Sequence, residues 1–179
     1  MEWTYHVSVI NRVTTDIDED FDKAFASTIA DWLPHELAKR GLTHLLNQGY
    51  FVEFGCGTGG VVAELQRRYP DVPMIGIDCD RERLTAAESR NSGAHFIRAR
   101  LEHTPLIDES VPLAFSSRIY QLENEHRYAE IIQEIHRILK SGAVYFVVDR
   151  LYERFTHAFA ECGFKVLHED SLTAIYQKR

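Results

Sequence analysis

The chain has 179 residues, of which 45% are hydrophobic and 26% charged, and its formal net charge is -7 at pH 7. This length suits one domain with a substantial core, so we expect residues 1–179 to form a single domain. The negative charge argues against nucleic acid as a partner, because phosphate neutralisation needs clustered Lys and Arg. No apolar run approaches the roughly 18 residues that span a bilayer, and we find no signal-peptide pattern at the N-terminus. We therefore expect no membrane partner and a cytoplasmic location.

Three cysteines are widely spaced along the chain: Cys56, Cys79 and Cys162. Their odd number and spacing match neither a disulfide framework nor a zinc site, so we expect free thiols, a reducing compartment and no metal.

The first 48 residues read as an N-terminal arm followed by helices. Residues 5–9 alternate apolar and polar side chains, which is typical of a short strand or extended arm. The acidic run from Asp16 to Asp22 favours a solvated helix start, although attraction for a cationic substrate or metal is the alternative. From Phe21 onward apolar residues recur every three or four positions, and Pro34 predicts that one helix ends and another begins.

The stretch from Tyr50 to Gly60, YFVEFGCGTGG, is the most informative part of the chain. An apolar run at 50–52 leads through Glu53 into a turn with four glycines, and a helical segment follows. A strand, tight glycine turn and helix in this order bring bare backbone against a ligand at a helix N-terminus.

Beyond this turn, hydrophobic periodicity predicts alternating helices and strands. The predicted helices cover residues 59–69, 81–91, 123–140 and 153–162. The predicted strands cover residues 73–78, 94–97, 113–116, 143–148, 164–168 and 172–176, with a loop at 101–111. Only three residues separate the last two strands, so they must form a hairpin. We predict an α/β fold with an open, mostly parallel, seven-stranded Rossmann-like sheet flanked by helices, whose C-terminal hairpin makes the last strand antiparallel.

The glycine turn by itself leaves two ligands open. Gly55-x-Gly57-x-x-Gly60 also fits the dinucleotide fingerprint, with Asp78 at about the right distance for a ribose. Glu53 distinguishes the two, because its carboxylate would repel a pyrophosphate at this turn. S-adenosylmethionine (SAM) instead brings an ammonium and a sulfonium, for which a nearby acid is favourable.

The segment from Glu53 to Gly59 resembles the acid-x-Gly-x-Gly-x-Gly signature of class I SAM-dependent methyltransferases. Ile77-Asp78 is similar to that family's acid at the end of the second strand, which holds the ribose hydroxyls. The segment from His136 to Gly142 resembles its Leu-Lys-Pro-Gly-Gly helix-to-strand signature, and Cys162-Gly163-Phe164 resembles its Gly-Phe start of the sixth strand. The resemblance covers roughly residues 42–179 and implies a core from 49 to 179 with SAM as cofactor.

The resemblance also implies which residues bind the cofactor. They follow the strand ends and their loops: Glu53, Gly55, Cys56, Gly57, Gly59, Asp78, Cys79, Arg100, Leu101 and Ser117. The sequence departs from the family pattern where Arg100 replaces the acid that meets the adenine amino group. A backbone amide or Glu102 is the expected substitute, and a lost hydrogen bond there would cost about 0.5–1.5 kcal/mol.

A second departure lies before the fourth strand. Val111-Pro112-Leu113 stands where the family usually has Phe-Asp, which bears on the detailed shape of the central sheet.

Methyl transfer is an in-line displacement in which positioning supplies much of the catalysis. A general base is needed only where the nucleophile must lose a proton early. The loop after the fourth strand lies beside the methyl group in this family. The substrate-facing candidates in this loop are Arg118, Tyr120 and Gln121, and Asp149, which follows the fifth strand, is a further candidate for lining the acceptor pocket. For these the alternatives are core packing of Tyr120, a solvated Arg118 and a structural ion pair at Asp149.

Two residues are candidates for a catalytic role, Tyr120 and His103. The alternative for His103 is an ordinary surface histidine.

These observations predict a SAM-dependent methyltransferase acting on a small-molecule acceptor, with residues 1–48 covering the acceptor site. One alternative is a SAM-binding protein without transferase activity. The other is a nicotinamide-dependent oxidoreductase.

Overall fold

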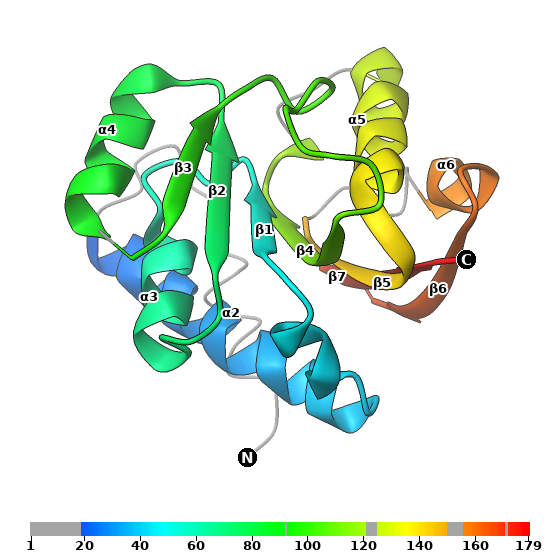
Figure 1. Ribbon diagram of the computed structural model, residues 1–179, viewed down its shortest axis with the longest axis horizontal. Helices are drawn as coiled ribbons and strands as arrows, with labels where there is room; N and C mark the ends of the chain where they lie inside the picture. Colours follow the sequence, from blue (N-terminus) through cyan, green and yellow to red (C-terminus); the bar gives the residue numbers. More distant parts are fainter. Residues whose placement is uncertain (1–18, 92, 121–124, 150–155, 171) are drawn as a thin grey trace.

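The computed structural model describes residues 19–91, 93–120, 125–149, 156–170 and 172–179 (Figure 1). Three predicted features therefore lie outside the described residues or their described side chains: the arm at 5–9, most of the N-terminal acidic run, and residues 153–155 of the last predicted helix. None of the described helices is both long and apolar enough to cross a membrane.

A seven-stranded sheet forms the centre of the fold, with strand order β3-β2-β1-β4-β5-β7-β6. The first five strands in this order pair in parallel, and β7 pairs antiparallel with both β5 and β6. The strands are β1 (Phe51–Phe54), β2 (Met74–Asp78), β3 (His95–Arg98), β4 (Val111–Ser117), β5 (Leu139–Val148), β6 (Phe164–Glu169) and β7 (Thr173–Lys178). The predicted mostly parallel sheet with an antiparallel last strand is confirmed.

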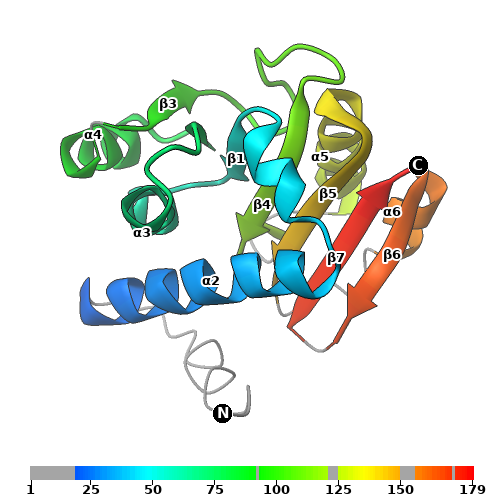
Figure 2. The ribbon, with the colours of Figure 1, turned by 60° about the horizontal axis from the view of Figure 1, so that its bottom comes forward.

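Helices cover both faces of this sheet. They are α2 (Glu19–Lys39), α3 (Gly60–Arg68), α4 (Arg81–Arg90), α5 (Glu125–Ile138) and α6 (Thr156–Glu161), with a 3-10 helix η1 (Thr43–Asn47) before β1. On one face α2 runs across the strands beside α3, and the ring of Trp32 meets that of Phe146 edge-on at 5.4 Å (Figure 2). The opposite face packs against α5 and α6.

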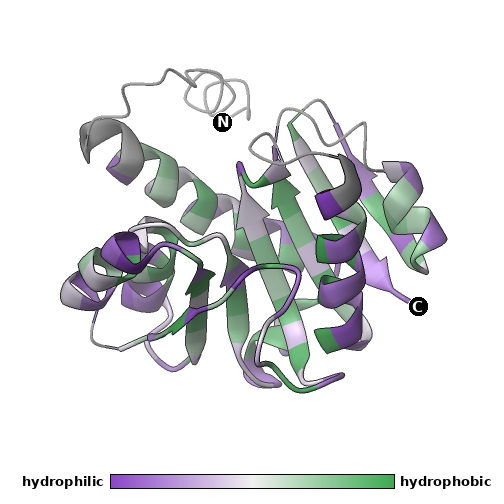
Figure 3. Ribbon diagram, turned by 90° about the horizontal axis from the view of Figure 1, so that it is seen from above, coloured by the Kyte–Doolittle hydropathy of each residue, from purple (hydrophilic) through white to green (hydrophobic). Residues whose placement is uncertain are grey.

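Hydrophobic pattern explains why these elements form and pack. Four isoleucines of α5 are fully buried: Ile131, Ile132, Ile135 and Ile138. Most of the strand ribbons carry hydrophobic colours, while the ribbon of α5 carries hydrophilic colours on its outer side (Figure 3). In β5 the residues from Val144 to Val148 are fully buried, because both faces of a central parallel strand are covered.

The expected break at Pro34 is wrong, since α2 runs through it without interruption. A proline inside a helix removes one backbone hydrogen bond and is unfavourable locally. Its neighbours Leu33 and Leu37 are each 1% exposed, so burial of the apolar face on the sheet keeps the helix continuous. Tertiary packing here outweighs the local preference.

The predicted end of the long helix is also wrong. That helix stops at Ile138, and Leu139 already pairs with Val111, so β5 begins four residues earlier than expected and contains Gly142. The N–H of Ser110 donates to the carbonyl of Ile138 at 2.9 Å. Pairing with the neighbouring strand β4 therefore ends the helix here. This contact is long-range, so helical periodicity cannot reveal it.

We predict that Ile135→Ala lowers the free energy of unfolding by about 2–5 kcal/mol, because a fully buried side chain leaves a cavity. Gln133→Ala, on the exposed side of the same helix, is the matched control and is expected to change it by less than about 0.5 kcal/mol. Urea unfolding followed by circular dichroism measures both. Equal effects of the two substitutions would contradict the assigned faces of α5.

Candidate functional site

The carboxyl ends of β1, β2 and β4 meet at one edge of the sheet. Phe54 pairs with Ile77 on one side and Ser116 on the other, so these strand ends lie next to one another. Glu53, Asp78 and Ser117 at these ends are all buried. In open parallel sheets this edge is where ligands bind.

The three glycines at 55, 57 and 59 all have φ in the left-handed region, but their surroundings differ. A Cβ built on Gly55 would lie 2.4 Å from Cγ2 of Ile119, and one on Gly59 would lie 2.8 Å from Cβ of Ala87. A Cβ on Gly57 would meet no atom within 4 Å. Gly55 and Gly59 therefore allow close packing inside the protein, whereas Gly57 presents backbone to open space.

Asp78 holds the glycine turn in place. Its Oδ2 accepts a hydrogen bond from the N–H of Gly57 at 2.8 Å, and its Oδ1 accepts one from the N–H of Asp80 at 2.9 Å. A carboxylate has about four acceptor positions, so each oxygen retains capacity for a ligand hydroxyl. The same group thus orders the turn and can bind a ligand.

Glu53 is the most unusual group at this edge. It is 5% exposed, and its Oε2 is buried with no hydrogen-bond partner among the described residues. Desolvation raises the pKa of the Glu53 carboxyl to about 8, although the charge of Arg118 and the N–H of Val62 act to lower it. The carboxyl is therefore largely protonated at neutral pH. Its unpartnered oxygen could still accept a hydrogen bond from a cationic group of a ligand.

Arg118 follows β4 and lies near Glu53. Its backbone has φ of 56°, and its N–H donates to the carbonyl of Val148 at 2.9 Å. The guanidinium is 4.6 Å from the centroid of the Phe25 ring on α2, a cation–π contact. The structure thus brings Arg118 together with Glu53 and with the helix that covers this face.

Tyr120 and Asp149 are buried in the core. The N–H of Tyr120 donates to Oδ2 of Asp149 at 2.9 Å, and its hydroxyl lies 3.1 Å from that of Tyr145. Tyr120 is fully buried, and this desolvation raises the pKa of its phenol well above the usual value. The structure therefore does not present Tyr120 to a substrate or as a base, and core packing, the alternative drawn from sequence, accounts for it. Gln121 lies outside the described residues.

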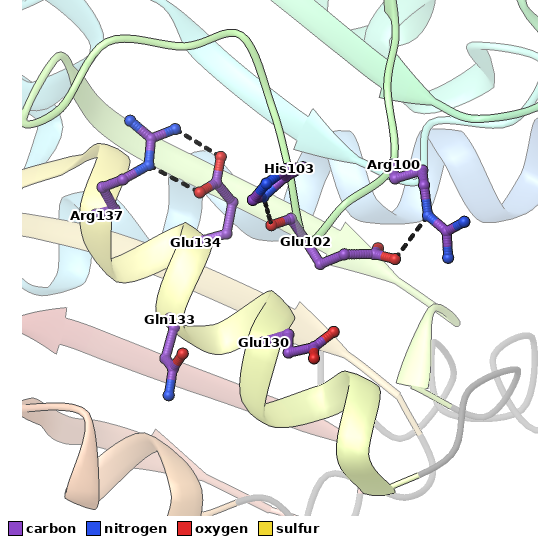
Figure 4. Close-up of a pocket in the computed structure, with 7 residues that line it drawn as sticks. All are labelled: Arg100, Glu102, His103, Glu130, Gln133, Glu134 and Arg137. Carbon is purple, nitrogen blue, oxygen red and sulfur yellow. Dashed lines mark hydrogen bonds and ion pairs between the residues drawn. The ribbon is translucent and has the colours of Figure 1, made fainter.

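The loop after β3 contributes to a different hollow. A pocket of about 510 Å³ lies between this loop and α5 (Figure 4). It is lined by Arg100, Glu102, His103, Glu130, Gln133, Glu134 and Arg137. His103 is exposed here and lies on the α5 side of the loop.

Ion pairs occupy most of the charges in this pocket. Glu102 is bound by Arg100 at 2.8 Å and by Arg127 at 3.1 Å, while Arg137 pairs with Glu134 at 2.6 Å. The carboxylate of Glu102, the expected substitute for the missing adenine-binding acid, is thus already engaged by two arginines. Leu101 of the same loop lies closer to the glycine turn, 3.9 Å from a Cβ built on Gly55.

The cysteines are all free, as predicted. Cys56 is buried under the turn, and desolvation raises the pKa of its thiol well above the usual value, so the thiol stays protonated. Cys79 is exposed beside Asp78. In the described part of the chain no group of three or more His, Cys, Asp or Glu side chains could hold a metal ion.

Sequence reasoning missed three residues that shape the site. Ile119 and Ala87 fill the space that the two packed glycines leave, and Phe25 supports Arg118. They carry no sequence signal, because each is an ordinary apolar residue whose partner lies far away in the chain.

Comparison with known proteins places these features in context. Residues 51–142 match the family described as a methyltransferase domain. A trans-aconitate 2-methyltransferase from Rhizobium rhizogenes is 36% identical over 93 residues, which cover 52% of this chain and 35% of that protein. A malonyl-[acyl-carrier protein] O-methyltransferase from Dechloromonas aromatica is 33% identical over 125 residues, which cover 66% of this chain and 42% of that protein. The chain therefore spans less than half the length of these curated relatives.

A solved structure shows the same fold. The TehB-like SAM-dependent methyltransferase from Corynebacterium glutamicum superposes with a TM-score of 0.64 at 16% identity, over 86% of this chain and 98% of that one.

We predict that Gly55→Ala destabilises the protein more than Gly57→Ala. Both substitutions strain a left-handed residue by about 1–2 kcal/mol, but only the first also drives a methyl group into Ile119. Thermal unfolding of the two variants measures the difference. A lower midpoint for Gly57→Ala would contradict the distinction between the two glycines.

We also predict that Glu53 makes stability depend on pH. The folded carboxyl has a pKa of about 8 against an ordinary value of 4.5, so the folded state holds a proton that the unfolded state has released between those values. The free energy of unfolding should therefore fall as pH rises through this window, by at most about 1.4 kcal/mol per pH unit.

The side chain of Glu53→Gln cannot ionise, so the free energy of unfolding of this variant should increase relative to that of the wild type as pH rises from about 5 to 8. Urea unfolding at several pH values measures the change, with Glu88→Gln on the exposed side of α4 as control. If the difference in stability between the wild type and Glu53→Gln stays constant with pH, the assignment of a neutral Glu53 is contradicted.

Proposed function

The chain belongs to the family of class I S-adenosylmethionine-dependent methyltransferases, and from this premise we propose that it transfers a methyl group from SAM to a small-molecule acceptor. SAM is the cofactor of this family.

The unpartnered carboxyl oxygen of Glu53 is the observation that carries the proposal. A buried acceptor without a donor is unfavourable, and a ligand ammonium would satisfy it. SAM has both a methionyl ammonium and a sulfonium, so it fits a site built around this acid. A dinucleotide pyrophosphate would instead be repelled once the carboxyl ionises.

Two further residues fit the rest of the cofactor. Asp78 retains acceptor capacity on both oxygens, which suits the two ribose hydroxyls. Gly57 leaves open space above the backbone, which suits close approach by the cofactor. We assign the packed glycines Gly55 and Gly59 an indirect role, since they fix the shape of the turn.

The remaining cofactor contacts are proposed from position. Ser117 is buried at the end of β4, and Leu101 lies against the glycine turn. Cys56 would contribute backbone, because its thiol is buried. Cys79 and Arg100 follow the ends of β2 and β3, on the side where the adenosine would lie.

When bound, SAM supplies a methyl group already activated by the sulfonium. The residues of this chain would bind, orient and shield the reactants, which is where most of the rate enhancement arises in such a displacement. The contact between Arg118 and Phe25 supports a covering role for α2 over the acceptor. We propose that residues 1–48 form this cover and residues 49–179 the cofactor-binding core of one domain.

A small-molecule acceptor is consistent with the named relatives. Those proteins are named for methylation of trans-aconitate and malonyl-[acyl-carrier protein]. The net charge of -7 disfavours a nucleic-acid acceptor. Free cysteines and the lack of a membrane-spanning helix among those described support a cytoplasmic location.

Isothermal titration calorimetry with SAM tests the proposal. We expect the wild type to bind SAM, Glu53→Gln and Asp78→Asn to bind about tenfold or more weakly, and the control Glu88→Gln to bind like the wild type. Because an ammonium would draw Glu53 into its ionised form, binding near pH 7 should release a proton, which makes the enthalpy depend on the buffer.

The outcomes separate the alternatives. Binding of NAD without binding of SAM would overturn the proposal in favour of an oxidoreductase. SAM binding without methyl transfer to any tested acceptor would favour a binding protein that lacks transferase activity.

A further inference from the structure

The loop after β3, residues 99–110, connects the carboxyl end of the sheet with α5. Its start is fixed to β2, because the N–H of Ala99 donates to the carbonyl of Asp78 at 3.0 Å. Two residues further on, the side chain of Leu101 lies 3.9 Å from a Cβ built on Gly55. The start of this loop therefore lies against both the end of β2 and the glycine turn, the two places where we propose that the cofactor binds.

The acidic side chain at the start of this loop is already occupied. Arg100 stands where the family pattern has an acid for the amino group of adenine, and the carboxylate of Glu102 is bound by Arg100 at 2.8 Å and by Arg127 at 3.1 Å. Leu101, between them, differs in its backbone. Neither its N–H nor its carbonyl makes a hydrogen bond within the described part of the chain, so both can pair with a ligand.

Adenine matches these two backbone groups. Its base-pairing edge carries an amino group that donates next to a ring nitrogen that accepts. A backbone carbonyl accepts and the N–H of the same residue donates, so one residue offers both partners. Such a contact is favourable where the backbone is held in one conformation before the ligand arrives, because less entropy is then lost on binding.

Glu134 on α5 holds the next part of the loop. Its side chain is 7% exposed, and Oε1 accepts hydrogen bonds from the N–H of Thr104 at 2.8 Å and from the hydroxyl of Thr104 at 2.6 Å. Burial acts to raise the pKa of the Glu134 carboxyl, but hydrogen bonds from Arg137 and Thr104 lower this pKa below its usual value. The carboxylate is therefore ionised at neutral pH, and its hydrogen bonds are of the strong, charge-assisted kind.

Arg137, one turn further along α5, completes the hold on the loop. Its guanidinium binds both oxygens of Glu134, at 2.6 and 2.8 Å (Figure 4). It also donates to the carbonyls of Thr104, at 3.3 Å, and Leu106, at 2.9 Å, and to the carboxylate of Asp108. We call Glu134 and Arg137 the α5 clamp. Its hydrogen bonds form one connected network, which makes this part of the loop rigid.

The α5 clamp acts directly beside Leu101. The N–H of His103 donates to the carbonyl of Arg100 at 3.0 Å and closes a turn that contains Leu101. The bond to β2 fixes this turn on one side, and the α5 clamp, through Thr104, fixes it on the other. The conformation of the Leu101 backbone therefore depends on a carboxylate of α5 that lies outside the glycine turn and the strand ends.

We propose that Glu134 is a positioning residue for cofactor binding: with Arg137 it fixes the loop after β3 so that the backbone of Leu101 pairs with adenine in place of the missing acid. This inference rests on the proposed binding of SAM at this site. Glu134 acts through the loop and not by contact with the cofactor.

Two nucleosides of homocysteine test the inference. S-adenosylhomocysteine carries adenine. S-inosylhomocysteine carries hypoxanthine, in which a carbonyl replaces the amino group and the neighbouring ring nitrogen carries a proton, so both partners of the Leu101 backbone are reversed. By calorimetry we expect the wild type to bind the adenine compound about tenfold or more tightly than the hypoxanthine compound.

Three variants complete the design. Glu134→Gln should weaken binding of S-adenosylhomocysteine about 5- to 20-fold but that of S-inosylhomocysteine less than about threefold, because only the adenine contact depends on the fixed loop. Thr104→Val removes the hydroxyl from the loop side and should act in the same direction with a smaller effect. Glu130→Gln is the matched control and should bind both compounds like the wild type. Glu130 is exposed on the same helix and lines the same pocket, but it makes no hydrogen bond to the described residues of the loop.

Amide hydrogen exchange follows the loop directly. In Glu134→Gln, exchange within residues 99–108 should become faster on the order of tenfold, because a charge-assisted hydrogen bond is lost, while exchange in β4 and β5 should stay as in the wild type. This measurement separates a loosened loop from a general loss of stability. Faster exchange throughout the sheet, or unchanged exchange in the loop, would contradict the clamp.

The outcomes distinguish the inference from the function on which it rests. Failure of the wild type to bind SAM and S-adenosylhomocysteine would overturn the proposed function itself. With that binding established, equal affinity of the wild type for the two nucleosides would overturn the adenine contact of Leu101. A ratio of the two affinities that Glu134→Gln leaves unchanged would overturn the positioning role, as would an equal change of this ratio in Glu130→Gln.

Discussion

A carboxyl group buried at the end of a parallel strand is the constraint on which the site depends. Glu53 lies on β1, which is inside the sheet between β2 and β4, and its side chain is buried near the N–H of Val62 on α3. Burial makes the neutral form favourable, and one oxygen still has no donor among the described residues. The fold thus maintains an unsatisfied acceptor, which a cationic ligand would complete. Burial favours the neutral carboxyl, whereas a cationic ligand favours the ionised one. The charge state of Glu53 should therefore change when such a ligand binds.

The turns after β1 and β4 are mechanically linked through the contact between Gly55 and Ile119. A substitution that changes the side-chain size of either residue would move both loops. This contact explains how the residue that follows Ser117 can be held in a strained conformation beside the glycine turn. Asp78 adds a second link, from β2 to Gly57. The three strand ends therefore form one preorganised unit, which reduces the reorganisation needed when ligands bind.

The sequence predicted most of the fold because its signals are local. Alternating strands and helices, and a hairpin forced by a short connection, gave the correct sheet. The errors at Pro34 and Leu139 arose where distant residues decide, through packing of α2 on the sheet and pairing of Leu139 with Val111. In the loop after β4, chain position pointed to Tyr120, but its side chain lies in the core. Arg118, two residues earlier in the same turn, instead lies over Phe25 and near Glu53.

The sequence by itself predicted the glycine turn, with Glu53 before it and Asp78 at the end of the next strand, because strand and turn signals are local in the chain. Only the tertiary structure decided that, of Gly55, Gly57 and Gly59 in the turn, Gly57 alone faces open space, and that Arg118 lies over Phe25. These facts depend on contacts between residues far apart in the chain. Their side chains are ordinary in type, and packing alone gives them their roles.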